Sequence, residues 1–162
     1  MNRHIAAGFM CLVFSLAVLD AHVTVTPRES MAGAEQIYTV NAMAEGTVPA
    51  TTLELEIPAG IHVTQIAKED GVTFDVKKDG DRIVSITWKR EIKPKGLARF
   101  TFTAHNPQPG PVQWKAHQTF ADGSMRHWVG ERGSKEPASV TTIVPKAGTT
   151  KAAPAADEHK HP

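Results

Sequence analysis

Short segments in which apolar and polar residues alternate recur along almost the whole chain. In Thr52–Ile57, for example, Leu53, Leu55 and Ile57 fall on one face and polar residues on the other. A period of two residues is typical of β-strands with one buried face, and no segment keeps a helical period. The expected strands are His22–Thr26, Gln36–Asn41, Thr52–Ile57, Ile61–Ile66, Val72–Val76, Ile83–Trp88, Ala98–Ala104, Val112–Phe120, Ser124–Val129 and Val140–Val144.

The breaks between these segments contain the residues that tight turns need. "KKDGD" at residues 77–81 and "ADGS" at residues 121–124 each place Asp-Gly between two strand-like runs, which is a strong hairpin signal. Strands of this length and spacing predict an all-β fold. We expect one immunoglobulin-like antiparallel β-sandwich, with Trp88 and Trp114 in its core because both share a face with aliphatic neighbours.

The two ends of the chain differ from this pattern. Residues 1–21 combine an early Arg3, an uncharged apolar run and a small residue at Ala21, which is the layout of a secretory signal peptide cleaved after Ala21. The β-rich domain spans residues 22–145, and residues 146–162 have the composition of a disordered polar tail. We therefore expect a periplasmic or secreted protein with no membrane span in its mature chain.

Charge and cysteine content exclude several functions. The formal net charge is +1 and no basic run stands out, so nucleic acid is a poor candidate partner. The one cysteine, Cys11, lies in the predicted signal peptide. The mature chain would then have no thiolate for blue copper, zinc–thiolate or iron–sulfur chemistry. No nucleophile or phosphate-binding motif is visible, and we expect no enzyme activity.

Cleavage after Ala21 would make His22 the first residue of the mature protein. Its α-amine and its imidazole Nδ1 would then bind one metal ion together, which an internal histidine cannot do with its amide nitrogen. The α-amine loses its proton near neutral pH, and such nitrogen donors suit tetragonal Cu(II). The ordinary alternative is a histidine that is first by chance.

A second histidine ligand would make a histidine brace, and the residues alone do not choose among His62, His105, His117 and His127. Alternation places His117 on the outer face of its strand. Trp128 shares a face with Arg126 and Ser124, so we expect it to lie at the surface near a site.

Four stretches resemble, in order, the YcnI-like copper-binding domain, once catalogued only as a domain of unknown function. They are "HVTVTPRESMAGAEQIYTV", "VPATTLELEIPAGI", "FTFTAHNP" and "DGSMRHWVGE", and the resemblance covers about residues 22–144. It implies an exported immunoglobulin-like sandwich that binds Cu(II) through its processed N-terminal histidine, a glutamate and a nearby tryptophan. By position these are His22, Glu45 and Trp128, whereas Glu35, Glu54 and Glu56 are less favoured.

Four functions remain open at this point. The first is copper homeostasis or delivery in the periplasm, with other copper chaperones or transporters as partners. The second and third, a CopC-like carrier and a histidine-brace copper enzyme, each require a second histidine ligand. The fourth is a metal-free interaction sandwich. The tail's Asp157, Glu158, His159 and His161 offer only a loose additional metal site.

Overall fold

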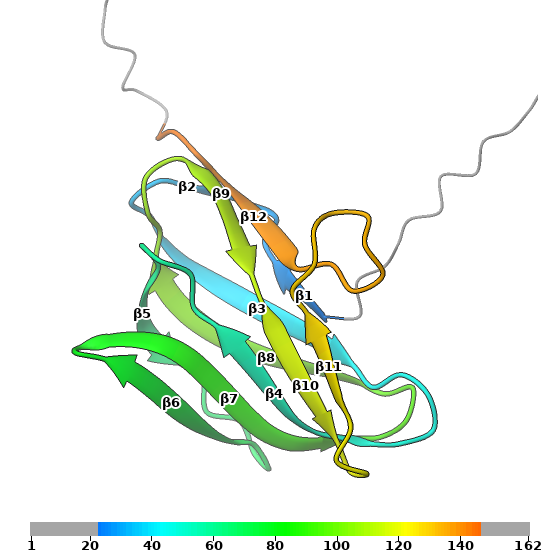
Figure 1. The fold of residues 1–162 in the computed structure, drawn as a ribbon. Coiled ribbons are helices and arrows are strands. Elements are labelled where there is room, and N and C mark those ends of the chain that lie inside the picture. The colour runs from blue at the N-terminus through cyan, green and yellow to red at the C-terminus, as the bar shows by residue number, and fades with distance from the viewer. Residues whose placement is uncertain (1–22, 147–162) are drawn as a thin grey trace, which may run out of the picture.

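The computed structural model describes residues 23–146, which form twelve β-strands and no helix. Figure 1 shows them as a sandwich of sheets. The predicted signal peptide, His22 and all of the predicted tail except Lys146 lie outside the described residues. The strands are β1 (Val23–Thr26), β2 (Glu29–Met31), β3 (Glu35–Met43), β4 (Ala50–Glu56), β5 (His62–Ile66), β6 (Thr73–Asp79), β7 (Arg82–Ile92), β8 (Leu97–His105), β9 (Gly110–Trp114), β10 (Ala116–Phe120), β11 (Met125–Trp128) and β12 (Ser139–Val144).

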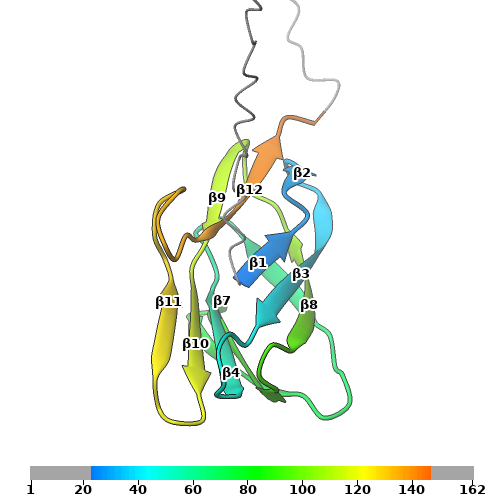
Figure 2. The same cartoon turned by 90° about the vertical axis from the view of Figure 1, so that its right-hand side faces the viewer.

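Two main sheets pack face to face, and a smaller third sheet extends them. The first sheet has the order β1-β3-β8-β5, the second β11-β10-β4-β7-β6 and the third β2-β12-β9. Neighbouring strands run antiparallel except for β2 and β12, which are parallel. Figure 2, turned by 90°, shows the first two sheets as separate layers, with β1 and β11 at the same open side of the sandwich. The predicted all-β sandwich is therefore confirmed.

The prediction of one strand over Val112–Phe120 is wrong in part. The chain changes partners at Lys115, so that β9 pairs with β12 while β10 pairs with β4 and β11. Burial still alternates through the break, because Trp114 and Ala116 are buried on either side of exposed Lys115. Alternation alone cannot reveal such a change of partner. The three-residue β2 was not predicted, since "ESM" is too short and too polar to show a period.

Aromatic side chains dominate the core between the layers. Trp88 stacks on Phe100 with ring centroids 5.1 Å apart, and Trp114 meets Phe102 edge-on at 5.8 Å. Both tryptophans are 1% exposed, which confirms their predicted place in the core. Large buried rings contribute strongly to stability through the apolar area that they remove from water.

A buried polar network ties β2 to the first sheet. The hydroxyl of Tyr38 donates to Oδ1 of Asn106 over 2.5 Å, and Nδ2 of Asn106 donates to the hydroxyl of Ser30 and to the carbonyl of Met31. Because Tyr38 and Asn106 are buried, removing one partner would leave the other without a hydrogen bond away from water.

Tyr38→Phe should lower the free energy of unfolding at neutral pH by about 1–3 kcal/mol, because the carbonyl oxygen of Asn106 loses its donor. Burial also raises the pKa of Tyr38 from 10.0 to about 12. The unfolded chain therefore loses the tyrosine proton at a lower pH than the folded chain does. As pH rises from 10.0 to about 12, the free energy of unfolding of the wild type falls for this reason, whereas Tyr38→Phe has no such proton to lose. Urea unfolding between neutral pH and pH about 11, with tyrosinate absorbance of this single tyrosine, measures both effects. Parallel stability–pH curves for the two proteins would contradict the assignment.

Candidate metal site at the start of the domain

The described part of the chain begins at Val23, directly after the predicted ligand His22. Val23 is buried and lies opposite Ala42 in the antiparallel pairing of β1 with β3. The start of β1 is therefore beside the end of β3. The backbone of β3 also contacts the second layer here, because Nε2 of Gln118 on β10 donates to the carbonyl of Met43 over 3.2 Å.

Glu45 lies two residues beyond β3, at the same end of the strand as Val23. Its side chain is 27% exposed, and its Oε2 accepts a 2.5 Å charge-assisted hydrogen bond from Nη1 of Arg126 on β11. The carboxylate is thus held between the two layers. Sequence reasoning missed Arg126, because it is 81 residues away along the chain and only the folded pairing brings it to Glu45.

Trp128 is the last residue of β11, the edge strand of the second sheet. The expectation that it lies at the surface is wrong, since it is only 1% exposed and belongs to the hydrophobic core. It does share a strand face with Arg126, as predicted, but β11 turns this face inward: Trp128 lies opposite Ala116 and Arg126 opposite Gln118, both of which are buried. Alternation identified the shared face and assigned it to the wrong side.

The structure therefore brings Glu45 and Arg126 together and places the strand of Trp128 at the same side of the sandwich as β1 (Figures 1 and 2). In chemical terms this region offers a carboxylate, a guanidinium and an indole. A carboxylate can bind a metal ion, whereas a guanidinium and an indole have only N–H donors. Within residues 23–146, no three His, Cys, Asp or Glu side chains converge on one point. A metal ion here would need further donors, and His22 is the adjacent residue that has them.

The other candidate histidines lie elsewhere. His117 and His127 face each other on the outer side of the second sheet, and Nε2 of His117 also contacts Oε1 of Glu56. The predicted outer position of His117 is confirmed. His62 and His105 are cross-strand neighbours in the first sheet, where His105 lies opposite Glu35 at the start of β3.

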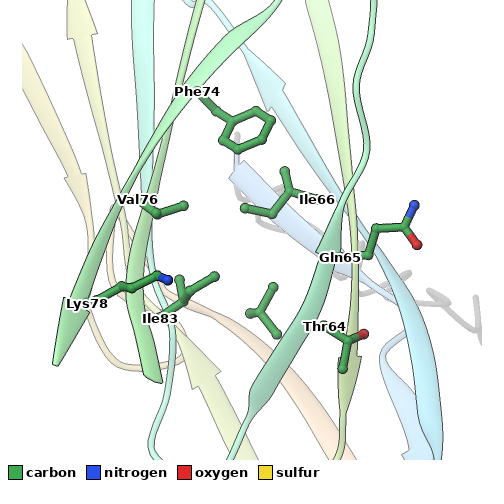
Figure 3. Close-up of a pocket in the computed structure, with 8 residues that line it drawn as sticks. Thr64, Gln65, Ile66, Phe74, Val76, Lys78 and Ile83 are labelled. Atoms are coloured by element: carbon green, nitrogen blue, oxygen red, sulfur yellow. The ribbon is translucent and has the colours of Figure 1, made fainter. Parts of the chain in front are cut away.

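A shallow apolar groove of about 250 Å³ opens between β5 and β6, at the far side of the sandwich from β1 and β11. Figure 3 shows Ile66, Phe74, Val76 and Ile83 around it. The lining is mostly aliphatic and aromatic and lacks carboxylates and imidazoles. It contributes nothing to the candidate metal site.

In the described part of the chain, no helix is long and apolar enough to cross a membrane.

Known proteins resemble the chain in sequence and in fold. The copper-binding protein CutI of Bacillus subtilis (strain 168) is 34% identical over an alignment of 152 residues that covers 91% of this chain and 72% of that protein. An uncharacterised protein from Nocardia farcinica with an immunoglobulin-like fold matches with a TM-score of 0.67 at 23% identity, over 76% of this chain and 98% of that one. This likeness confirms the immunoglobulin-like fold. The model of the domain of unknown function DUF1775 matches residues 22–144, and the chain therefore belongs to the DUF1775 family, as the sequence resemblance implied.

Proposed function

We propose that the mature protein binds Cu(II) at the start of β1, with the α-amine and imidazole of a processed His22 as its main ligands. Glu45 supplies an oxygen donor and Trp128 covers the site from the second layer. The observation that carries this proposal is the position of Glu45, just beyond the end of β3 that pairs with the start of β1. The 34% identity to a copper-binding protein supports copper as the metal.

Covalent geometry supports the role of His22. His22 directly precedes Val23 in the chain, and one peptide bond keeps consecutive Cα atoms within about 3.8 Å of each other. Val23 pairs with Ala42, three residues before Glu45, so the amine of a chain cut after Ala21 would be released beside this carboxylate. Two nitrogen donors, one oxygen and water form a donor set that suits tetragonal Cu(II).

The ion pair with Arg126 fits a ligating role for Glu45. A carboxylate has two oxygens, so it can accept a hydrogen bond from Arg126 and bind a cation at the same time. Hydrogen-bonded partners of this kind hold ligand side chains in position. Arg126 would thus orient Glu45, and its positive charge would remain neutralised by the carboxylate.

The geometry favours this single-histidine site over the two-histidine alternatives. Glu35, opposite His105, lies seven residues along β3 from Ala42, or about 23 Å. His62 pairs with His105, so both histidines are distant from the start of β1. His117 and His127 lie on the outer face of the second sheet, whereas Arg126 and Trp128 face inward. A CopC-like or histidine-brace site with these residues would need His22 on another part of the molecule.

The proposed biological role is copper homeostasis or delivery after export, with the signal peptide removed after Ala21. Cleavage would then restrict tight copper binding to the exported protein, because the precursor has an amide where the mature protein has an amine. Periplasmic copper chaperones or transporters are the expected partners. The proposed role requires no catalytic group.

Copper uptake by the chain that begins at His22 tests the proposal. Equilibrium dialysis should find one tightly bound Cu(II), and Glu45→Gln should weaken its binding at least about tenfold while keeping the side-chain shape. Glu35→Gln is the matched control, because Glu35 lies at the opposite end of β3 and should leave the affinity unchanged. If the mature protein binds no Cu(II) tightly, the result would support a metal-free interaction sandwich instead. Equal affinities for Glu45→Gln and wild type would remove Glu45 from the site.

A further inference from the structure

Three polar side chains form a row across the outer face of the second sheet. The row runs from His127 on β11 through His117 on β10 to Glu56 on β4, and Figure 1 shows these strands side by side. His127 is exposed and His117 is 20% exposed. The rings of the two histidines meet edge-on, with centroids 5.0 Å apart. This face is the reverse of the one that carries Trp128.

The hydrogen bonds of the row fix the tautomer of His117. Its Nε2 lies 2.8 Å from Oε1 of Glu56, and an ionised carboxylate can only accept, so this nitrogen carries the proton. In neutral His117 the other nitrogen, Nδ1, then carries a lone pair and no proton. It lies 2.7 Å from Nδ1 of His127. A carboxylate on one imidazole nitrogen with a lone pair on the other is the arrangement found behind metal-ligating histidines.

The spacing of the two Nδ1 atoms also fits a metal ion. Two nitrogens about 2.0 Å from one ion at a right angle lie about 2.8 Å apart, whereas tetrahedral geometry separates them by about 3.3 Å. The observed 2.7 Å matches neighbouring positions of a tetragonal ion. In the absence of metal, the proton on Nδ1 of His127 would lie between the two Nδ1 atoms and donate a hydrogen bond to His117. Because His127 is exposed, that proton can move to its other ring nitrogen when an ion takes the lone pair.

We propose that His117 and His127 form a second Cu(II) site, which is independent of His22 and oriented by Glu56. Only two protein nitrogens bind the ion, since no third His, Cys, Asp or Glu in the part of the chain described converges on them. Water completes the coordination, so the site is open and exchanges its ion more readily than a chelated N-terminal site. The water-filled coordination positions of an ion bound at this edge strand would let a donor or acceptor protein share the ion.

The decisive experiment uses a full-length mature chain that carries His22→Ala, which removes the N-terminal chelate. His159→Ala and His161→Ala are included to remove the histidines of the tail. This protein should bind one Cu(II), and pulsed EPR should show two coupled imidazoles. His117→Ala or His127→Ala should each weaken binding at least tenfold and remove the two-imidazole signal. Glu56→Gln should weaken it about tenfold, because it loses the group that orients His117.

The matched control removes the other cross-strand pair, His62 and His105, for which the structure gives neither a ring contact nor a hydrogen bond between the two side chains. His62→Ala/His105→Ala should leave both the stoichiometry and the EPR signal unchanged. Thermal unfolding verifies that each variant is folded. Copper binding that survives His117→Ala and His127→Ala, or that falls equally in the control, would overturn the proposal. Because the N-terminal chelate is absent from every protein compared, the result does not depend on whether His22 binds copper in the native mature chain.

Discussion

Trp128→Ala should lower the free energy of unfolding by about 3–5 kcal/mol, because it removes a fully buried indole and leaves a cavity at the edge of the core. This loss corresponds to a fall in melting temperature of about 10 °C or more in a domain of this size. Urea and thermal unfolding of the metal-free protein measure it. The effect is expected without copper, since Trp128 packs in the hydrophobic core of the described chain.

The matched control is Val129→Ala, the next residue, which is 38% exposed. It should change stability by no more than about 0.5 kcal/mol. If the two variants unfold alike, the packing assigned to Trp128 is incorrect. Trp128→Phe, which fills more of the space, is the variant in which to measure copper binding. A lower copper affinity in a stably folded Trp128→Phe would show that the indole also acts on the metal.

Acetylation of the α-amine of His22 should weaken the tight Cu(II) site by at least roughly 100-fold, because a chelating amine becomes an amide and the advantage of two linked donors is lost. The imidazole of His22 remains in the acetylated chain, so the comparison isolates the amine. Competition with a copper chelator of known affinity measures the change.

The control protein carries an amide on the terminal carboxyl group of Pro162, at the other end of the chain, and should bind copper as the wild type does. Circular dichroism should show the same β-rich fold in all three proteins. Equal copper affinity in the acetylated and native chains would mean that the amine is not a ligand.

Much of the fold could be predicted because burial on one face imposes a two-residue period on each strand. Thr52–Ile57 and Ala98–Ala104 show this period clearly, and the structure places both in strands apart from Ile57, which follows the end of β4. The period carries no information about which strand is the neighbour. The change of partners at Lys115 and the parallel pairing of β2 with β12 depend on the whole sandwich and have no local signal.

The candidate site was predictable to a smaller extent. His22 is found from the cleavage signal alone, and it remains a prediction because the residue lies outside the described part of the chain. Alternation placed Arg126 and Trp128 on one face, but only the sandwich decides that this face is buried. The contacts of Glu45 with Arg126 and of His117 with His127 depend on strand pairing and loop position, which the sequence pattern does not contain.

In the proposed site the processed His22 binds copper through both its amine and its imidazole. This ligand set is checked by EPR of the chain that begins at His22, loaded with one equivalent of Cu(II) and compared with His22→Ala. With histidine labelled with ¹⁵N, we expect coupling to one imidazole and to the labelled α-amine, and the loss of this spectrum in His22→Ala. A spectrum with two imidazoles that is unchanged by His22→Ala would contradict it.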